Sequence, residues 1–383
     1  MRYNSMKITC KKEFWICASA MAAVILYYAF VGSKPRADGI KLGGAFGLSG
    51  NCAEWGEGEK MAAEMAVDEI NAAGGINGTK INFIIEDTQC ENKTTVNAVM
   101  KLVHADGVKA LIGPTWGDAY QGASAVLNEA KVVGVSGDTA MEALEFQNQP
   151  IDYIFSTYAP QRKEIAALQG YAKMTGIKKV AMVWDQDPYS TMMTLLFKEA
   201  SPAHGIAVTD EHEMPTGTQD FRTIIAKING MKPDAVFVSF LAPHTKASFL
   251  KQVKELGFKG IILSAADIQD ESVLKSFGVL MDGVIYTYPV ANAGQKAFRE
   301  RYYAKYATEP QGPAAVNAYD AVYVVAEAIK GGAKTGTEIR DALLGIRIKG
   351  AFVPDLGFDA KHQIEGGDFE VKTVRNGAFV PLK

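Results

Sequence analysis

From residue 39 onward, short apolar runs alternate with longer segments in which apolar residues recur every three or four positions. Short apolar runs are typical of buried strands, and the longer period predicts amphipathic helices. The helix expected over 55–73 places Ala62, Ala66 and Ile70 on one face and ends at the glycines 74–75. The first half is expected to contain strands 40–46, 80–86, 108–112 and 132–136 and helices 55–73, 94–105 and 120–130. This alternation predicts parallel βαβ units with right-handed crossovers.

The same alternation restarts near residue 153 and fills a second half. Its expected strands are 153–157, 179–184, 207–213, 235–239, 260–264 and 284–289, with helices 165–175, 189–204, 221–229 and 245–256. Two similar halves predict two doubly wound α/β lobes with a cleft between them. Three more helices (294–306, 313–330, 337–344) and a hairpin-like end (357–359, 369–373, 379–381) follow. Because this block comes after two complete halves, it must pack back on one lobe, so the chain is expected to cross between lobes more than once.

The first 37 residues have a different character. Lys7, Lys11 and Lys12 precede an apolar run over 16–32, and a Lys-Pro-Arg stretch follows it. A basic region before an apolar segment indicates an export signal. The run is near the lower length limit of a membrane-spanning helix, so a cleaved signal peptide and a retained N-terminal anchor both stay open. The rest of the chain is expected outside the cytoplasm, in the periplasm or on the extracellular face.

Charge and cysteine content narrow the function classes. The 383 residues carry a net charge of -3, and the basic N-terminal segment leaves the remainder near -8. Phosphate contacts require a basic surface, so no nucleic-acid partner is expected. Cys52 and Cys90 are the two cysteines outside the N-terminal segment. They follow neighbouring predicted strands in a compartment where disulfides persist, which favours a bridge over two free buried thiols.

Motifs for nucleotide binding and catalysis are missing from the sequence. The glycines of the first strand–helix loop do not have the spacing of a dinucleotide fingerprint, and no Walker A motif occurs. The nearest approach to a nucleophile elbow, GVSGD at 134–138, lacks the final glycine. The five histidines are scattered, without metal-ligand spacing. We therefore expect no catalysis, no cofactor and no metal.

Two loops remain as candidate binding elements. One contains Thr115, Trp116 and Gly117, and the other spans 136–139; each follows a parallel strand and precedes a helix. Loops in these positions converge at the carboxyl edge of an open α/β sheet, and helix N-termini favour anions. The pattern suits one ligand carboxylate. Helix capping by Asp118, Asp138 and Thr139 is an equal alternative.

Specific stretches resemble a known family. Residues 46–87 read FGLSGNCAEWGEGEKMAAEMAVDEINAAGGINGTKINFIIED, and KLVHADGVKALIGP and YDAVYVVAEAI follow later. In combination these resemble the type I periplasmic solute-binding proteins of ABC importers, in the leucine/isoleucine/valine-binding branch, from residue 40 to the C-terminus. The resemblance implies two Rossmann-like lobes joined by three crossings, with lobe one over 38–155 plus 289–350 and lobe two over 156–288 plus 351–383. Such lobes close over a ligand and present it to a membrane permease without chemistry.

The resemblance also implies ligand roles in lobe one. Trp55 matches an aromatic residue that covers the ligand side chain, with lobe packing as its alternative role. Gly117 matches a position that is usually a serine holding the ligand carboxylate, so Thr115 or a water would have to substitute for the lost hydroxyl. Thr139, with Gly137 and Asp138 beside it, matches a second carboxylate-binding loop. There Asp138 would repel a ligand carboxylate unless it is turned away.

In lobe two, Tyr189 matches a tyrosine that touches the ligand amino group, and Asp267 falls where relatives have an acid paired to that ammonium. Capping of the following helix is the alternative role of Asp267. Trp116 stands where relatives have a cysteine that bridges to one near Cys90, so it reshapes the side-chain pocket. A Cys52–Cys90 bridge would staple the same region differently.

These inferences combine into one hypothesis. The chain is expected to be an exported, monomeric solute-binding protein that captures an amino acid, of branched-chain type or a related small carboxylate, for an ABC import permease. A membrane-anchored ligand-sensing module with the same lobes is the second hypothesis. A hydrolase that uses the cleft is the third.

Overall fold

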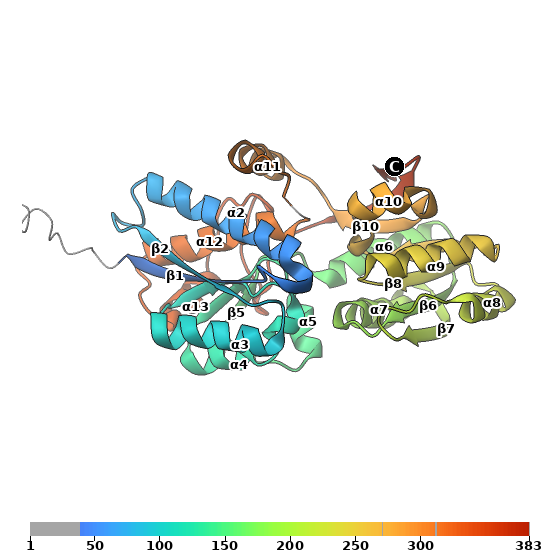
Figure 1. Ribbon diagram of the computed structural model, residues 1–383, viewed down its shortest axis with the longest axis horizontal. Helices are drawn as coiled ribbons and strands as arrows, with labels where there is room; N and C mark the ends of the chain where they lie inside the picture. The colour runs from blue at the N-terminus through green and yellow to red at the C-terminus, as the bar shows by residue number, and fades with distance from the viewer. Residues whose placement is uncertain (1–38, 270, 311, 383) are drawn as a thin grey trace, which may run out of the picture.

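Two helix-covered sheets form two lobes that lie side by side along the long axis of the molecule (Figure 1). The computed structural model describes residues 39–382 except 270 and 311. The N-terminal signal or anchor expected over 1–37 lies outside these residues. Within the described part of the chain, no helix combines the length and apolarity needed to cross a membrane.

The first sheet has the strand order β2-β1-β3-β4-β5, and every neighbouring pair is parallel. Its strands are β1 (Ile40–Phe46), β2 (Ile81–Asp87), β3 (Ala110–Ile112), β4 (Val133–Ser136) and β5 (Ile154–Ser156). Its connecting helices are α2 (Ala53–Ala72), α3 (Asn92–Met100), α4 (Ala123–Ala130) and the short α5 (Met141–Phe146). The parallel βαβ arrangement predicted for this half is confirmed.

The second sheet has the order β12-β11-β10-β9-β8-β6-β7. The parallel strands are β6 (Lys179–Asp185), β7 (Ala207–Met214), β8 (Ala235–Ser239), β9 (Ile261–Ser264) and β10 (Ile285–Pro289). Antiparallel β11 (Phe369–Arg375) and β12 (Ala378–Pro381) complete one edge. Its helices are α6 (Gln161–Met174), α7 (Pro188–Ala200), α8 (Arg222–Met231), α9 (Pro243–Glu255) and α10 (Glu271–Met281).

The late helical block returns to the first lobe, as its position in the sequence required. It comprises α11 (Ala293–Tyr306), α12 (Ala314–Lys330) and α13 (Gly336–Leu344). Because α12 is rich in small and β-branched residues, it approaches α2 closely, and its valines share one core with Ala62 and Ala66. The chain thus leaves the first lobe after β5, returns after β10 and leaves again before β11.

The segment between α13 and β11 packs on the first lobe. Phe352, Leu356 and Ile364 are buried in the core of the first lobe, although lobe two was expected to resume at residue 351. The segment 357–359, expected as part of the terminal hairpin, forms isolated bridges, such as that of Phe358 with Ile364. The division into lobes stays a proposal, and this packing favours a last boundary after Ile364.

Asp320 fixes this returning segment to α12. Its two carboxylate oxygens accept the backbone N–H groups of Ala351 and Phe352, both at 2.7 Å. Burial raises the pKa of Asp320 to about 7, against the opposing effect of these two hydrogen bonds.

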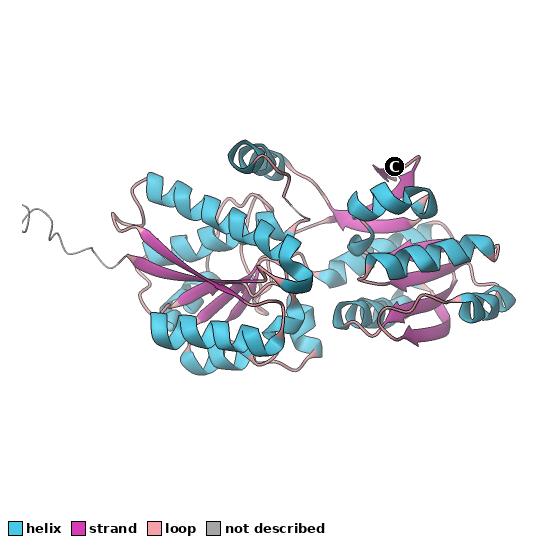
Figure 2. Ribbon diagram, in the orientation of Figure 1, coloured by secondary structure: helices cyan, strands magenta, loops and turns pink. Residues whose placement is uncertain are grey.

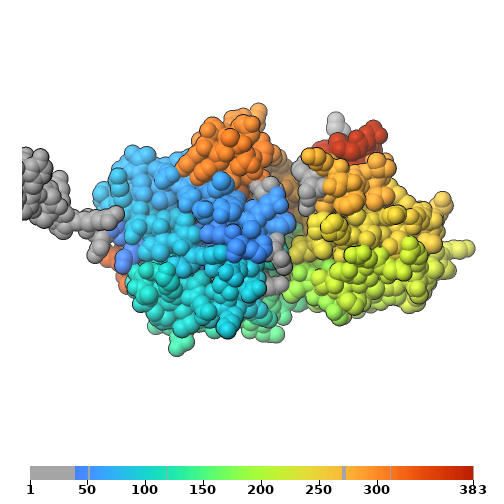
Figure 3. Space-filling model, in the orientation of Figure 1, coloured from blue at the N-terminus to red at the C-terminus, as the bar shows by residue number. Residues whose placement is uncertain are grey.

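The carboxyl ends of the two parallel sheets face each other. β5 runs directly into α6 of the second lobe, and β10 runs directly into α11 on the first lobe. The parallel neighbours of β5 and of β10 therefore also end toward the opposite lobe, as the strand arrows in Figure 2 show. The space-filling view shows the surface indented between α11 and the C-terminal hairpin (Figure 3). Loops that follow the strands of both sheets therefore meet between the lobes.

Candidate functional site

The loop after β3 is held rigidly against the first strand. The Tyr120 hydroxyl donates to the carbonyl oxygen of Gly113 at 2.6 Å and closes the loop. Gly113 has φ +101°, and a side chain there would overlap the carbonyl oxygen of Ala45 on β1. Glycine is therefore needed for the loop to leave the sheet at this angle.

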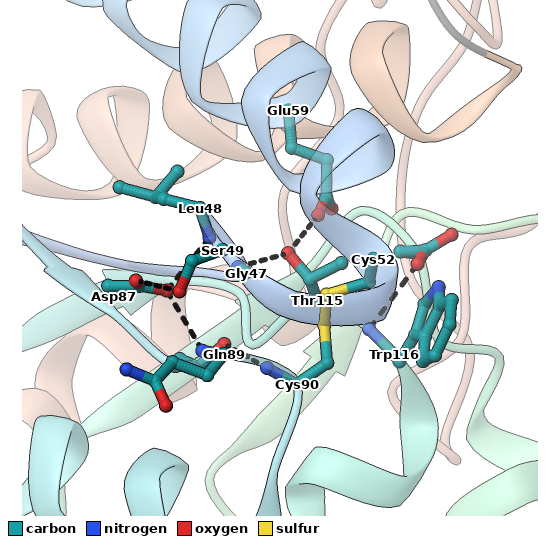
Figure 4. The surroundings of a disulfide bond; sticks show 12 residues. Gly47, Leu48, Ser49, Cys52, Glu59, Asp87, Gln89, Cys90, Thr115 and Trp116 are labelled. Carbon is teal, nitrogen blue, oxygen red and sulfur yellow. Dashed lines mark hydrogen bonds between the residues drawn. A yellow bond between two sulfur atoms is a disulfide. The ribbon is translucent and has the colours of Figure 1, made fainter.

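Within this loop, Thr115 is fully buried and engaged on both sides. Its Oγ1 accepts the backbone N–H of Gly47 at 3.2 Å and donates to the Glu59 carboxylate. Figure 4 shows the hydroxyl between these two groups. The expectation that Thr115 offers its hydroxyl to a ligand is not supported by this arrangement, in which it ties the loop to α2.

Glu59, the acceptor of the Thr115 hydroxyl, was not among the predicted site residues. It is fully buried, and its Oε1 has no hydrogen-bond partner among the described residues. Burial, and then the charge of Asp138, raises the pKa of Glu59 well above its ordinary value, which the Thr115 hydrogen bond only partly opposes. The sequence does indicate that Glu59 is buried. Glu59 precedes Ala62 by three residues and therefore lies on the apolar face of the helix.

Asp138 faces the same loop. Its Oδ2 accepts the backbone N–H of Trp116 at 3.3 Å, and burial raises its pKa. The capping alternative does not apply to Asp138, because the Ser136 hydroxyl accepts the N–H groups of Asp138 and Thr139, and α5 has no side-chain cap. The Asp138 carboxylate thus accepts a hydrogen bond from the loop that was predicted to bind the ligand carboxylate.

Two tryptophans form an aromatic corner beside this carboxylate. The rings of Trp55 and Trp116 have centroids 5.9 Å apart and are tilted by 57°. A disulfide joins Cys52, just before Trp55, to Cys90, with the Cα atoms 6.2 Å apart (Figure 4). It fixes the start of α2 to the segment after β2, so the Trp55 backbone is anchored at the edge of the sheet.

The remaining predicted residues of the first lobe differ in role. Gly137 is a packing position, since a Cβ there would lie 2.6 Å from the backbone nitrogen of Ala318 on α12. Gly117 lies against Thr139, whose methyl would be 3.2 Å from an added Cβ. The Thr139 hydroxyl is buried and has no hydrogen-bond partner among the described residues. It therefore stays a ligand candidate.

In the second lobe, Asp267 is already paired. The Nζ of Lys246 lies 3.0 Å from its Oδ2 and also donates to its backbone carbonyl at 2.5 Å. Burial raises the pKa of Asp267, and Lys246 opposes this shift. Asp185, fully buried at the end of β6, has a raised pKa for the same reason. The predicted counter-ion for a ligand ammonium thus already holds an ammonium of the protein.

Tyr189 lies among further acids. Asp187 caps α7 by accepting the backbone N–H groups of Tyr189 at 2.9 Å and Ser190 at 3.3 Å, which places Tyr189 in the first turn. Burial raises the pKa of Tyr189, and the charges of Glu164 and Asp267 add to this. Tyr189 and Asp267 therefore lie in the same part of the second lobe.

Glu164, also unpredicted, fixes the loop that carries Asp267. It is fully buried, and its Oε1 accepts the N–H of Ala266 at 2.6 Å and the hydroxyl of Thr287 at 3.1 Å. Burial raises its pKa to about 8. Burial, and then the charges of Glu164 and Asp138, raise the pKa of Tyr158 just after β5, so acids of both lobes lie near it.

The carboxyl ends of the parallel strands of the two lobes face each other, and aromatic and acidic side chains lie at both of these ends. This arrangement is that of a two-lobed ligand-binding protein. Among the described residues, no group of three or more His, Cys, Asp or Glu side chains is arranged to hold a metal ion. Residues 39–377 match the family described as "Periplasmic binding protein", and the chain belongs to this family. Members of the family are exported solute-binding proteins.

Relatives and solved structures agree with this assignment. The "Leucine-, isoleucine-, valine-, threonine-, and alanine-binding protein" of Pseudomonas aeruginosa is 26% identical over 359 residues, or 92% of this chain and 94% of the relative. A branched-chain amino acid transporter substrate binding protein from Streptococcus pneumoniae, solved with isoleucine, has a TM-score of 0.76 and 27% identity over 90% of this chain and 100% of that one.

A solute-binding protein from R. palustris, solved with benzoate, shares the fold with a TM-score of 0.74 and 20% identity over 90% of this chain and 95% of that one. The α/β two-lobed fold expected from the sequence is thus confirmed.

Proposed function

We propose that this protein captures a small solute between its two lobes and delivers it to an ABC import permease, without catalysing a reaction. The solute is an amino acid or a related compound that bears an amino group. The observation that carries the proposal is that the carboxyl ends of the two parallel sheets face each other and that candidate side chains lie at both ends. Trp55, Trp116 and Thr139 come from the first lobe, and Tyr189 and Asp267 from the second. The names of the Pseudomonas and Streptococcus relatives support an amino acid as the solute class.

The arrangement suits capture because each lobe contributes part of the contact surface. The tryptophan corner offers apolar area for a side chain, and the acidic second lobe offers Tyr189 and its neighbours for an amino group. Closing the lobes removes the solute from water and strengthens these polar contacts. Ligand-dependent closure gives a permease a surface that differs between the empty and the loaded protein.

The direct test is a thermal-shift screen followed by calorimetric titration. The panel contains leucine, isoleucine, valine, threonine, alanine, benzoate and 3-methylbutylamine. A solute at 100 times its Kd should add about 2.7 kcal/mol to the free energy of unfolding. Tyr189→Ala should weaken binding about tenfold or more. Glu129→Gln, an exposed acid on α4, is the matched control and should bind as the wild type does.

The proposal fails if no member of the panel stabilises the protein. It also fails if Tyr189→Ala and Trp55→Ala both bind the stabilising solute with wild-type affinity, because that result would place the solute outside the cleft.

A further inference from the structure

The carboxyl end of the first sheet already contains two carboxylates of the protein. Asp138 accepts the N–H of Trp116 at 3.3 Å, and Glu59 accepts the hydroxyl of Thr115. These are two of the loop groups that would otherwise be available to a ligand carboxylate. A ligand carboxylate placed here would meet an engaged loop. At pH 8, above the pKa of about 7 that burial gives Asp138, it would also meet a charge of its own sign.

No basic side chain neutralises these acids. Within the described part of the chain, neither Glu59 nor Asp138 forms an ion pair with a lysine or arginine. The Oε1 of Glu59 is buried without a hydrogen-bond partner there. A buried, unpaired carboxylate is costly, and a cation bound beside it would remove that cost.

An independent feature points to the same ligand chemistry. The indole rings of Trp55 and Trp116, 5.9 Å apart and tilted by 57°, form a corner next to Asp138. The faces of indole rings attract ammonium groups, and this attraction grows where water is excluded. Beside Gly117 the buried Thr139 hydroxyl, 3% exposed, has no partner among the described residues and is free to accept an N–H.

The second lobe gives an anion no better place. Lys246 is paired with Asp267 and lies near Asp185, and the acids Glu164 and Asp187 lie close to Tyr189. An α-carboxylate placed beside Tyr189 would therefore meet a lysine that is already paired with an acid of the protein.

We propose that Trp55, Trp116, Asp138 and Thr139 form an ammonium-binding corner, and that the solute is an organic cation without a carboxylate at this end. The inference rests on the proposed function, because it concerns the same cleft. Within that function it reverses the expected orientation, since the first lobe receives the cationic end of the ligand.

The test compares three probes with closely similar branched side chains in calorimetric titrations of the protein at pH 8. Leucine carries both charged groups, 3-methylbutylamine only the ammonium, and 4-methylpentanoate only the carboxylate. We expect 3-methylbutylamine to bind at least about tenfold more tightly than leucine, and 4-methylpentanoate not to bind.

The Asp138→Asn variant separates charge from shape. Its amide oxygen can still accept the Trp116 N–H, so the loop is expected to hold. The affinity for 3-methylbutylamine should fall about tenfold or more, and leucine should bind more tightly than to the wild type, because a repelling charge is gone. Glu129→Gln removes one exposed negative charge elsewhere and should change neither affinity.

The outcomes distinguish the two proposals. Tight binding of leucine or 4-methylpentanoate with weak or no binding of the amine overturns the ammonium corner but leaves solute capture intact. Unchanged amine affinity in Asp138→Asn also overturns the corner. If none of the three probes binds, the corner is rejected, and the wider panel then decides whether solute capture is rejected as well.

Discussion

The ammonium of Lys246 lies 3.0 Å from the carboxylate of Asp267, and the two side chains are only 4% and 5% exposed. Lys246 comes from α9 and Asp267 from the loop after β9, so the pair joins two neighbouring elements at the cleft end of the second lobe. Breaking a buried pair leaves an uncompensated charge, which costs more than the pair itself contributes.

Lys246→Met should therefore lower the free energy of unfolding by about 3 kcal/mol. Combining it with Asp267→Asn should recover much of this loss, because the unpaired charge is then also gone. Urea denaturation of the wild type, both single variants and the double variant gives the coupling energy. Additive effects of the two substitutions would show that the pair does not exist in solution.

The Cys52–Cys90 disulfide closes a loop with a sequence separation of 38 residues. Replacing both cysteines by serine should lower the free energy of unfolding by about 3 kcal/mol, mainly because the unfolded chain regains conformational freedom. Gly47→Ala should also lower the free energy of unfolding, because its Cβ would overlap both sulfur atoms of the disulfide. Thermal unfolding of each variant, with and without reductant, is the measurement. If the reductant leaves the unfolding temperature of the wild type unchanged, that result would contradict the presence of the disulfide.

Buried acids should make the protein less stable as the pH rises through neutrality. Burial raises the pKa of Glu164 to about 8, so the folded state holds a proton that the unfolded state releases near its ordinary pKa of 4.5. The stabilisation is fully present below that unfolded pKa and is lost as the pH rises through the folded pKa. The free energy of unfolding should therefore fall between pH 5 and pH 8.

Glu164→Gln tests this assignment, because its carbonyl oxygen can still accept from Ala266 and Thr287. The variant should lose less stability than the wild type between pH 5 and pH 8, as measured by urea denaturation at each pH. Glu129→Gln should follow the wild type. A Glu164→Gln profile parallel to that of the wild type would assign the pH dependence to other groups.

Most of the fold could be predicted because its signals are local. Strands such as β1 and β8 are continuous apolar runs bounded by loops, and the helices between them show the 3.6 period over several turns. The short α5 and the interrupted α10 were missed because few turns give no clear period. The expected helix over 120–130 divides at Gly122, whose φ of +79° separates a 3-10 turn from α4.

The candidate site was only partly predictable. The resemblance to the solute-binding family indicated Trp55, Asp138 and Tyr189. The partners of these side chains could not be predicted, because they depend on contacts between segments that are distant in the sequence. Lys246 and Glu59 each lie on the apolar face of a helix, which is the signal that could have indicated a buried charge.

Small-angle X-ray scattering, with and without the tightest-binding solute from the panel, tests most directly whether the solute is captured between the lobes. With the site saturated, as judged by calorimetry, the radius of gyration should decrease, because the two lobes close over the solute. An unchanged radius of gyration at saturation would contradict capture between the lobes.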